Sequence, residues 1–406
     1  MTQRLWFITG AGRGLGRAFT EVALEHGDRV VATIRRDGVL DDLAKEYGDR
    51  LIPRRLDIAV RDDVFRVVDE VAATVGTPDV VVNNAGYGLV GAVEELSEEE
   101  LRAQFDVNLF GAVWVTQAVL PHLRARGSGR IVQVSSVGAV GHLPLFGAYN
   151  ATKWALEGLS AGLAEEVKPL GIDVHLLQLG GFATDWAGSS MRFTTADPAY
   201  DETRTAILGM PSYPTPEMIQ AATDEAAAEV QAGTGDLSPA GDLAAAVEGG
   251  AGGVAAESAA AEEGAAEGPA GEGVAAEGAA GEGAAAEGAA GDEAAMGSAA
   301  GERVAAEGAA GDEAAMGSAA GEGAAGEGVA AEGAAGEGAG DGMPEDESPR
   351  VAAEALLTLL DEPEPPLREV IGAGAHEMVR MALGWRRDDY ERDPAFVWPD
   401  ASQPVG

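Results

Sequence analysis

Short apolar runs and segments with helical spacing alternate regularly through the first 180 residues of the chain. The apolar runs lie at residues 5–9, 30–34, 51–58, 80–83, 131–135 and 172–178. The helical segments lie at residues 14–26, 61–75, 106–126 and 150–168. A strand that is apolar along its length is typical of a parallel sheet buried on both faces. The alternation therefore predicts an α/β fold with one doubly wound parallel sheet.

The alternation stops after residue 180. Residues 181–222 are expected to form a loop with one or two short helices. Pro349 suits the first position of a helix that covers 351–360, and residues 367–371 indicate a seventh strand. From Trp385 onward we expect a tail with exposed aromatic side chains.

Residues 223–347 consist almost entirely of Ala, Gly and Glu, with no aromatic residue, Ile or Lys. They hold 28 of the 68 acidic residues and one of the 27 basic residues. Such a segment cannot bury enough apolar surface to offset its ordering entropy. It also lacks the stacking apolar positions of a solenoid, although residues 284–302 and 304–322 are near-identical copies. We predict a low-complexity, disordered insertion between two parts of one domain, residues 1–222 and 348–406. An inert insertion is favoured over a polyanionic interaction tail.

Composition excludes several kinds of protein. The chain has no cysteine, and its five histidines are isolated in the sequence, so we expect no metal site and no thiolate catalysis. A net charge of −41 opposes binding to nucleic acid or to an anionic membrane surface. The first strand begins within a few residues and no long apolar run follows, so we expect a cytoplasmic protein without a signal peptide or membrane span.

A glycine-rich turn connects the first strand to its helix. The sequence TGAGRGLG at residues 9–16 supplies backbone amides at a helix N-terminus with no side chains in the way, which suits a dinucleotide pyrophosphate. The alternative is a tight turn with incidental glycines. We favour dinucleotide binding over this alternative. A dinucleotide-binding turn after the first strand indicates that the parallel sheet is of the Rossmann type, with about seven strands.

The second strand ends where NAD-binding proteins place an acidic residue for the ribose hydroxyls. Ile34 occupies that position here, and Arg35 and Arg36 follow it. Guanidinium groups bind phosphate in bidentate fashion, so the pair favours the 2′-phosphate of NADP(H), with Arg13 as a further charge. NAD(H) stays open as the second choice, because both arginines are equally typical of a solvated surface.

Tyr149 and Lys153 lie four residues apart at the start of a predicted helix and therefore share a face. A free phenol has a pKa near 10, and a neighbouring ammonium lowers it. The pair can exchange a proton with a substrate oxygen while hydride moves to or from carbon. Ser136 follows the fifth strand and can hydrogen-bond that oxygen. The alternatives are that Tyr149 and Lys153 form an ordinary surface pair and that Ser136 belongs to a plain serine turn.

These motifs together resemble the short-chain dehydrogenase/reductase family in order and spacing. The residues that carry the resemblance are TGAGRGLG, Asp57, NNAG at 83–86, Asn108, Ser136 and Tyr149-x-x-x-Lys153. The segment from GYGLVGAVEEL to LGGFATDW resembles the 17β-hydroxysteroid-dehydrogenase-like subgroup. The resemblance covers residues 1–222 and 348–385.

The resemblance implies a role for each matching residue. Tyr149 is the general acid/base, Lys153 lowers its pKa and binds the nicotinamide ribose, and Ser136 orients the substrate oxygen. Asn108 supports a water-linked proton relay to Lys153. The implied cofactor-binding residues are Gly10, Gly12, Arg13, Gly14, Leu15, Gly16, Arg35, Arg36, Asp57, Asn84, Ala85, Gly86, Tyr149, Lys153, Gly180 and Thr184. Leu179 replaces the proline that the family usually has before Gly180, which loosens the turn leading to Thr184.

The expected activity is therefore NADP(H)-preferring oxidoreduction of a carbonyl and an alcohol. A nucleotide-binding regulatory module without turnover is the alternative, although such modules tend to lose the tyrosine or the lysine. The candidate pocket residues are largely apolar and suit a small hydrophobic substrate: Tyr87, His142, Leu143, Phe146, Trp186 and Met191. The resemblance also implies a homodimer or homotetramer that forms through the helices at 106–126 and 150–168.

Overall fold

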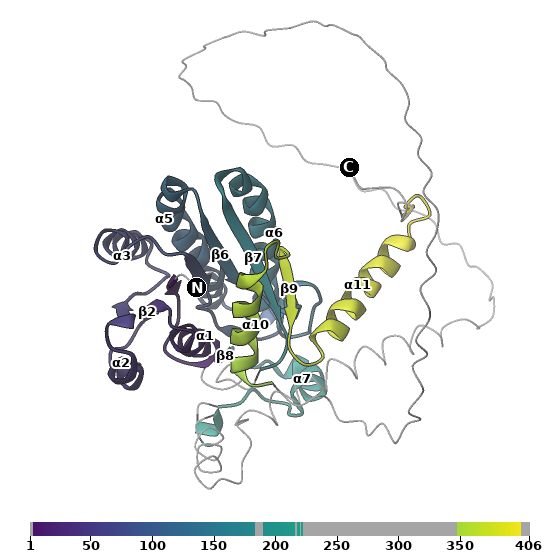
Figure 1. Ribbon diagram of the computed structural model, residues 1–406. Coiled ribbons are helices and arrows are strands. Elements are labelled where there is room, and N and C mark those ends of the chain that lie inside the picture. Colours follow the sequence, from purple (N-terminus) through teal and green to yellow (C-terminus); the bar gives the residue numbers. More distant parts are fainter. Residues whose placement is uncertain (1–2, 183–189, 216, 220, 222–346, 399–406) are drawn as a thin grey trace, which may run out of the picture. The chain divides into compact units, whose positions relative to one another are not determined.

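The computed structural model describes residues 3–182, 190–215, 217–219, 221 and 347–398. Its centre is a seven-stranded parallel sheet with the order β3-β2-β1-β4-β6-β7-β9 (Figure 1). The strands are β1 (Leu5–Ile8), β2 (Arg29–Ile34), β3 (Leu51–Arg55), β4 (Val80–Asn83), β6 (Gly129–Val134), β7 (Ile172–Leu179) and β9 (Arg368–Ile371). The predicted α/β fold with seven parallel strands is confirmed.

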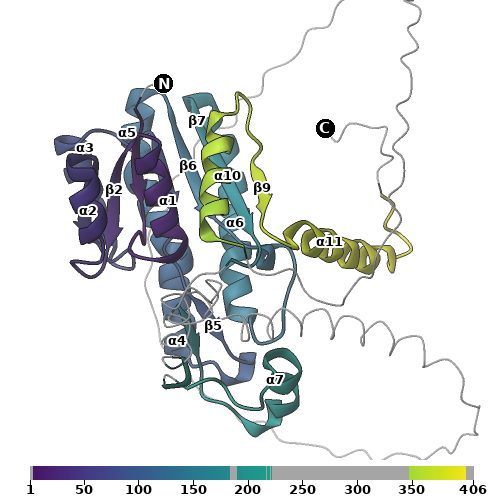
Figure 2. The same ribbon diagram turned by 60° about the horizontal axis from the view of Figure 1, so that its bottom comes forward.

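Two apolar layers cover the sheet. On one face, α1 (Gly14–Glu25), α2 (Asp41–Tyr47) and α10 (Pro349–Asp361) pack against side chains such as Trp6 and Ile8. Figure 2 shows α1 and α10 side by side on this face. On the other face, α3 (Arg61–Thr74), α5 (Gly111–Arg126) and α6 (Gly147–Val167) contribute valines and leucines around Phe7. Each β-helix-β crossover thus buries one helical stripe and leaves the carboxyl ends of the strands free to carry the site.

A small second sheet lies outside the main one. Strand β5 (Gly88–Val90) pairs in parallel with β8 (Met191–Phe193), and α7 (Asp201–Leu208) follows. The expected loop over 181–222 therefore contains one of the predicted short helices and also a strand that was not predicted. Strands of three residues give no usable periodicity, so neither β5 nor β8 was predicted.

The chain from Ser348 onward completes the domain. Ser348 caps α10 by accepting a hydrogen bond from the Arg350 amide, and β9 adds to the edge of the sheet beside β7. The predicted tail from Trp385 is wrong in its first part, because α11 runs from Ala375 to Glu391. Ala375 and Ala382 are buried on this helix. The low-complexity segment 223–347 lies outside the described residues except for Glu347, so its predicted disorder stays a prediction.

Two other predicted boundaries need correction. The strand expected over 51–58 ends at Arg55, and the chain then turns. The helix expected over 106–126 follows α4 (Glu98–Phe105) directly, and its first residues, Asp106–Phe110, form a π-helical turn before α5. A capping box formed by Ser97 and Glu100 starts α4.

Candidate active site

The glycine-rich turn closes on itself and on the end of β4. Gly10 has a positive φ of 67°, and a side chain there would lie 3.0 Å from Ala85. A side chain at Gly16 would overlap the Gly10 carbonyl oxygen and the Asn84 amide nitrogen. Helix α1 begins at Gly14 with no side-chain cap and no acidic residue in its first turn. Its first amides are therefore available to an anion, which is the arrangement a pyrophosphate needs.

Asn84 and Thr9 connect this turn to β4. The Asn84 side chain donates to the carbonyl oxygens of Thr9 at 2.9 Å and Gly10 at 3.3 Å. The buried Thr9 hydroxyl accepts from the backbone amides of Asn84 at 2.9 Å and Ala85 at 3.0 Å. The NNAG motif thus holds the glycine loop in position. Gly86 follows, where a side chain would lie 3.3 Å from Asn108.

The carboxyl end of β2 carries the two arginines that the sequence singled out. Ile34 is the last residue of β2, and its side chain lies beside Gly12. In the described part of the chain, Arg35 and Arg36 form no hydrogen bond, ion pair or ring contact. Most arginines of this acidic chain do have such partners. Unpaired guanidiniums at this edge are therefore available to a phosphate.

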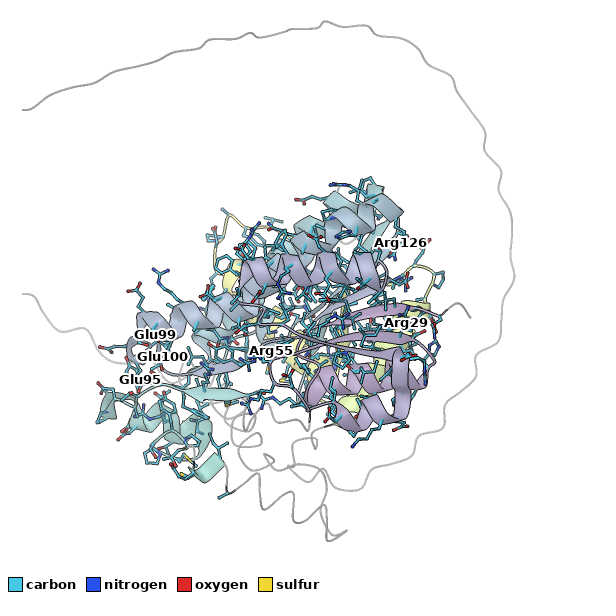
Figure 3. The ribbon with its side chains drawn as sticks, turned by 90° about the vertical axis from the view of Figure 1, so that its left-hand side faces the viewer. Arg29, Arg55, Glu95, Glu99, Glu100 and Arg126 are labelled. Carbon is cyan, nitrogen blue, oxygen red and sulfur yellow. The ribbon has the colours of Figure 1, made fainter. Side chains whose placement is uncertain are left out.

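The sheet register adds a third arginine that the sequence did not suggest. Arg55 pairs with Ile34 across β2 and β3, and it is exposed and without a described polar partner. Figure 3 shows Arg55 well away from Arg29, which begins β2 at the opposite end of the sheet. Asp57 follows β3, where its carboxylate accepts from the Ala59 amide at 3.1 Å and lines a surface pocket with Arg55.

The predicted proton-transfer residues meet at the start of α6. Tyr149 is buried, and its side chain forms a hydrogen bond with Ser136, the residue that follows Ser135 at the end of β6. The Ser136 hydroxyl also accepts from the Gly138 amide at 3.1 Å. Burial raises the pKa of Tyr149 to about 12, and the hydrogen bond from Ser136 opposes this shift.

Lys153 occupies the same buried corner as Tyr149. The Lys153 nitrogen lies 5.7 Å from the centre of the Tyr149 ring and donates to the Val134 carbonyl oxygen at 2.7 Å. Burial lowers the pKa of Lys153 to about 8, and the negative charge of Glu157 opposes this shift. Burial thus raises the pKa of Tyr149 despite the nearby lysine, and the role of Lys153 in lowering that pKa stays a prediction.

Asn108 lies in the π-helical turn and is buried. Its side chain exchanges hydrogen bonds with the Tyr87 backbone, accepting at 3.0 Å and donating at 2.9 Å, and it also approaches the Thr152 hydroxyl at 3.4 Å. Because Thr152 directly precedes Lys153 on α6, the π-helical turn brings Asn108 next to this helix. Its predicted part in a water-linked relay stays a prediction.

An apolar cluster surrounds the Tyr149 ring. Its members come from β5, β8, α7 and the segment before α6: Val90, Ala92, Leu145, Phe146, Tyr149, Met191, Ile207, Leu208 and Tyr213, with Leu143 packed against them. Three predicted pocket residues, Leu143, Phe146 and Met191, therefore lie together beside the phenol. Two others are not members of this cluster: His142 contacts the ring of Trp385, and Tyr87 packs under Arg192.

A buried ion pair fastens this cluster to the rest of the domain. Arg204 on α7 bonds Glu95, and both side chains are almost completely buried. The Tyr213 hydroxyl also bonds Glu95, and the Glu95 carboxylate accepts from the Ala92 amide at 2.8 Å. Figure 3 shows Glu95 with Glu99 and Glu100 at the end of the molecule opposite Arg29 and Arg126. Sequence reasoning missed this pair, which depends on contacts between distant segments.

Gly180, Thr184 and Trp186 are predicted site residues that follow β7 in the chain. Gly180 follows β7, where its amide donates to the Ile371 carbonyl oxygen at 2.9 Å. Leu179 is the last residue of β7 and pairs with Ile371, so it forms part of the regular sheet. Thr184 and Trp186 lie outside the described residues.

Comparison with known proteins agrees with this geometry. Residues 4–193 match the short chain dehydrogenase family. A protein of Botryotinia fuckeliana named oxidoreductase BOA17 is 44% identical over 201 residues, which cover 49% of this chain and 73% of that protein. A 3-ketodihydrosphingosine reductase of Bacteroides thetaiotaomicron is 37% identical over 184 residues, which cover 45% of this chain and 66% of the reductase.

A solved structure of a short-chain dehydrogenase also matches most of the chain. A short-chain dehydrogenase from Streptomyces avermitilis superposes with a TM-score of 0.60 at 26% identity, covering 96% of each chain. The chain belongs to the short-chain dehydrogenase family, as its motifs indicated. It is an oxidoreductase of this NAD(P)-dependent class of enzymes.

Among the residues that the structure describes, no helix has the length and apolarity needed to cross a membrane. The same residues include no group of three or more His, Asp or Glu side chains arranged to hold a metal ion.

Proposed function

We propose that this oxidoreductase prefers NADP(H) and interconverts a hydrophobic carbonyl compound and its alcohol, with Tyr149 exchanging the proton on the substrate oxygen. The observation that carries the proposal is the position of the Tyr149 hydroxyl. It is hydrogen-bonded to Ser136 and enclosed by the apolar cluster, at the sheet edge that also carries the glycine loop. An apolar wall beside a proton donor suits a ketone or aldehyde.

The residues for the cofactor fit a phosphorylated dinucleotide. Gly10, Gly14 and Gly16 shape a loop whose backbone can approach a pyrophosphate, and the first amides of α1 add hydrogen-bond donors. Arg35 and Arg36 would bind the 2′-phosphate, since guanidinium groups match phosphate in bidentate fashion. When bound, the nicotinamide supplies or accepts the hydride.

The protonation states favour reduction. Because burial raises the pKa of Tyr149 to about 12, the phenol keeps its proton at neutral pH. A protonated phenol can give that proton to the carbonyl oxygen as hydride adds to the carbonyl carbon, which yields the alcohol and a phenolate. Lys153, with a pKa of about 8, is mostly charged at neutral pH and stabilises the phenolate as it forms.

The substrate class follows from the cluster around Tyr149. Leu143, Phe146 and Met191 offer apolar surface and no charged group. This favours steroid-like, retinoid-like or other hydrophobic carbonyl compounds and agrees with membership of the 17β-hydroxysteroid-dehydrogenase-like subgroup. The similarity to a protein named 3-ketodihydrosphingosine reductase supports a ketone as the reacting group.

We also propose that the enzyme assembles as a homodimer or homotetramer through α5 and α6. Helix α6 and the π-helical turn directly before α5 present large exposed apolar side chains: Phe110, Trp154 and Leu159. Such side chains are typical of a subunit interface. Light scattering on the purified protein would give the mass of the assembly directly.

The test of the proposed activity is the oxidation of NADPH and NADH in the presence of hydrophobic ketones and aldehydes. We expect turnover with NADPH at a higher kcat/KM than with NADH. Binding of NADPH without turnover across a broad panel would instead favour a nucleotide-binding regulatory module.

A further inference from the structure

A buried carboxylate lies one helical turn beyond Lys153 and has no part in the reaction proposed above. Glu157 on α6 is 7% exposed. One of its oxygens accepts hydrogen bonds from the Ser135 hydroxyl at 2.8 Å and from the Gln178 side chain at 3.0 Å. The other accepts from Arg368 at 2.7 Å. Every one of these donors comes from outside α6.

The donors lie on or directly after three neighbouring strands. Ser135 follows β6 and precedes Ser136, Gln178 lies near the end of β7, and Arg368 begins β9. Glu157 therefore joins the catalytic helix to the strand end that carries Ser136. It also joins that helix to a strand that the chain supplies only after residue 347.

The negative charge of Glu157 stabilises the charged form of Lys153. The Lys153 nitrogen is buried, and its described hydrogen bond goes to the neutral carbonyl of Val134. Tyr149 and Glu157 lie one helical turn before and after Lys153 on α6, and the negative charge of Glu157 favours the charged form of Lys153. From the sheet, the charge of Arg368 reaches this corner through its ion pair with Glu157. A buried ammonium without a carboxylate nearby gives up its proton readily.

We propose that Glu157 is a positioning residue, which keeps Lys153 charged and fixes the Ser135–Ser136 end of β6 against the catalytic helix. Arg368 orients the carboxylate and offsets part of its charge. The inference rests on the proposed function in one respect: it takes Lys153 as the residue that supports Tyr149.

The chain offers a direct measurement, because Lys45, Lys153 and Lys168 are its only lysines. NMR of protein labelled with ¹³C at the lysine ε-carbon follows the titration of each one, and Lys45→Arg and Lys168→Arg assign the signals. In the wild type we expect Lys153 to titrate near pH 8. In Glu157→Gln its pKa should fall by about one unit, since an attractive charge is lost.

Arg368→Gln is the matched control. It removes the other half of the ion pair but leaves the carboxylate near Lys153, so the pKa of Lys153 should not fall. Arg368→Gln should lose thermal stability, because it leaves the buried Glu157 carboxylate without its ion-pair partner. Glu157→Gln should lose less, since the Arg368 side chain that it leaves unpaired is exposed. The double variant Glu157→Gln/Arg368→Gln should regain part of that stability, whereas its Lys153 should still titrate as in Glu157→Gln.

Unchanged titration of Lys153 in Glu157→Gln would overturn the inference. An equal fall in Arg368→Gln would overturn it too, since general loosening of the site would then explain both. If Glu157→Gln does not fold, the double variant, which leaves neither charge unpaired, decides the question. The titration requires no turnover, so failure of the wild type to reduce carbonyls would contradict the proposed function separately.

Discussion

The Lys153 ammonium lies 5.7 Å from the centre of the Tyr149 ring, one helical turn away, with its hydrogen bond directed to the Val134 carbonyl oxygen. The two groups are buried together, and burial favours the neutral form of each. The Tyr149 phenol therefore keeps its proton at neutral pH, whereas the pKa of Lys153 lies only slightly above neutral pH. This pairing leads to a specific dependence of the reaction on pH.

Reduction should decline as the pH rises above about 8. The pKa of Lys153 is lowered by burial to about 8, so the ammonium is present below that pH and is lost above it. Tyr149 keeps its proton over the same range because its pKa is raised to about 12. The check is a profile of kcat/KM for ketone reduction between pH 6 and 10. A profile that stays level to pH 10 would show that the charge of Lys153 does not matter.

Cofactor preference should depend on the arginines after β2. Replacing both Arg35 and Arg36 by Gln removes charge-assisted hydrogen bonds to a 2′-phosphate, so the Kd for NADPH should rise about tenfold to a hundredfold. The Kd for NADH should change little. Quenching of protein fluorescence by each cofactor measures both constants.

Arg29→Gln is the control for this double variant. Arg29 has no described side-chain partner, and Figure 3 shows it at the end of the sheet away from Arg55. It should leave both cofactor constants unchanged. Equal weakening of NADPH and NADH binding in the double variant would mean that the arginines do not recognise the 2′-phosphate.

Thr9→Val should destabilise the glycine loop. The substitution keeps the shape of the side chain but removes the hydroxyl oxygen that accepts the amides of Asn84 and Ala85. Leaving the part-buried Ala85 amide without its acceptor should lower the free energy of unfolding by about 1–3 kcal/mol and weaken cofactor binding. Urea denaturation measures the first effect. Thr74→Val, at an exposed hydroxyl on α3, should change stability by less than about 0.5 kcal/mol.

The apolar cluster beside Tyr149 should set the preference for hydrophobic substrates. Leu143→Ser removes apolar surface, so kcat/KM for a long-chain ketone should fall about tenfold, with a smaller change for acetone-sized ketones. Val351→Ser, on the exposed side of α10, serves as the control. If both ketones lose the same factor, Leu143 contributes to folding and not to substrate selection.

Features encoded by local sequence were predictable. The periodic runs predicted the strands of the main sheet, and the glycine turn and the Tyr149–Lys153 spacing led to residues that the fold brings to one edge. The capping box at Ser97 and Glu100 is local in the same way, because a cap depends on residues only three apart.

Features that depend on distant contacts were not predictable. Arg55 reaches the end of β2 only through the register of β3, and Glu157 meets Arg368 only after β9 joins the sheet. The pKa of Tyr149 was expected to fall because Lys153 is near in sequence. Burial in the tertiary structure raises this pKa, since both side chains are enclosed and desolvation outweighs their proximity.

The most direct test of the account is Tyr149→Phe, which removes one hydroxyl from the centre of the site and preserves the ring. NADPH-dependent reduction of a ketone that the wild type accepts should fall by about 10² to 10⁴-fold, with the Kd for NADPH nearly unchanged. Turnover by Tyr149→Phe within a few-fold of the wild type would contradict the assignment of Tyr149 as the proton donor.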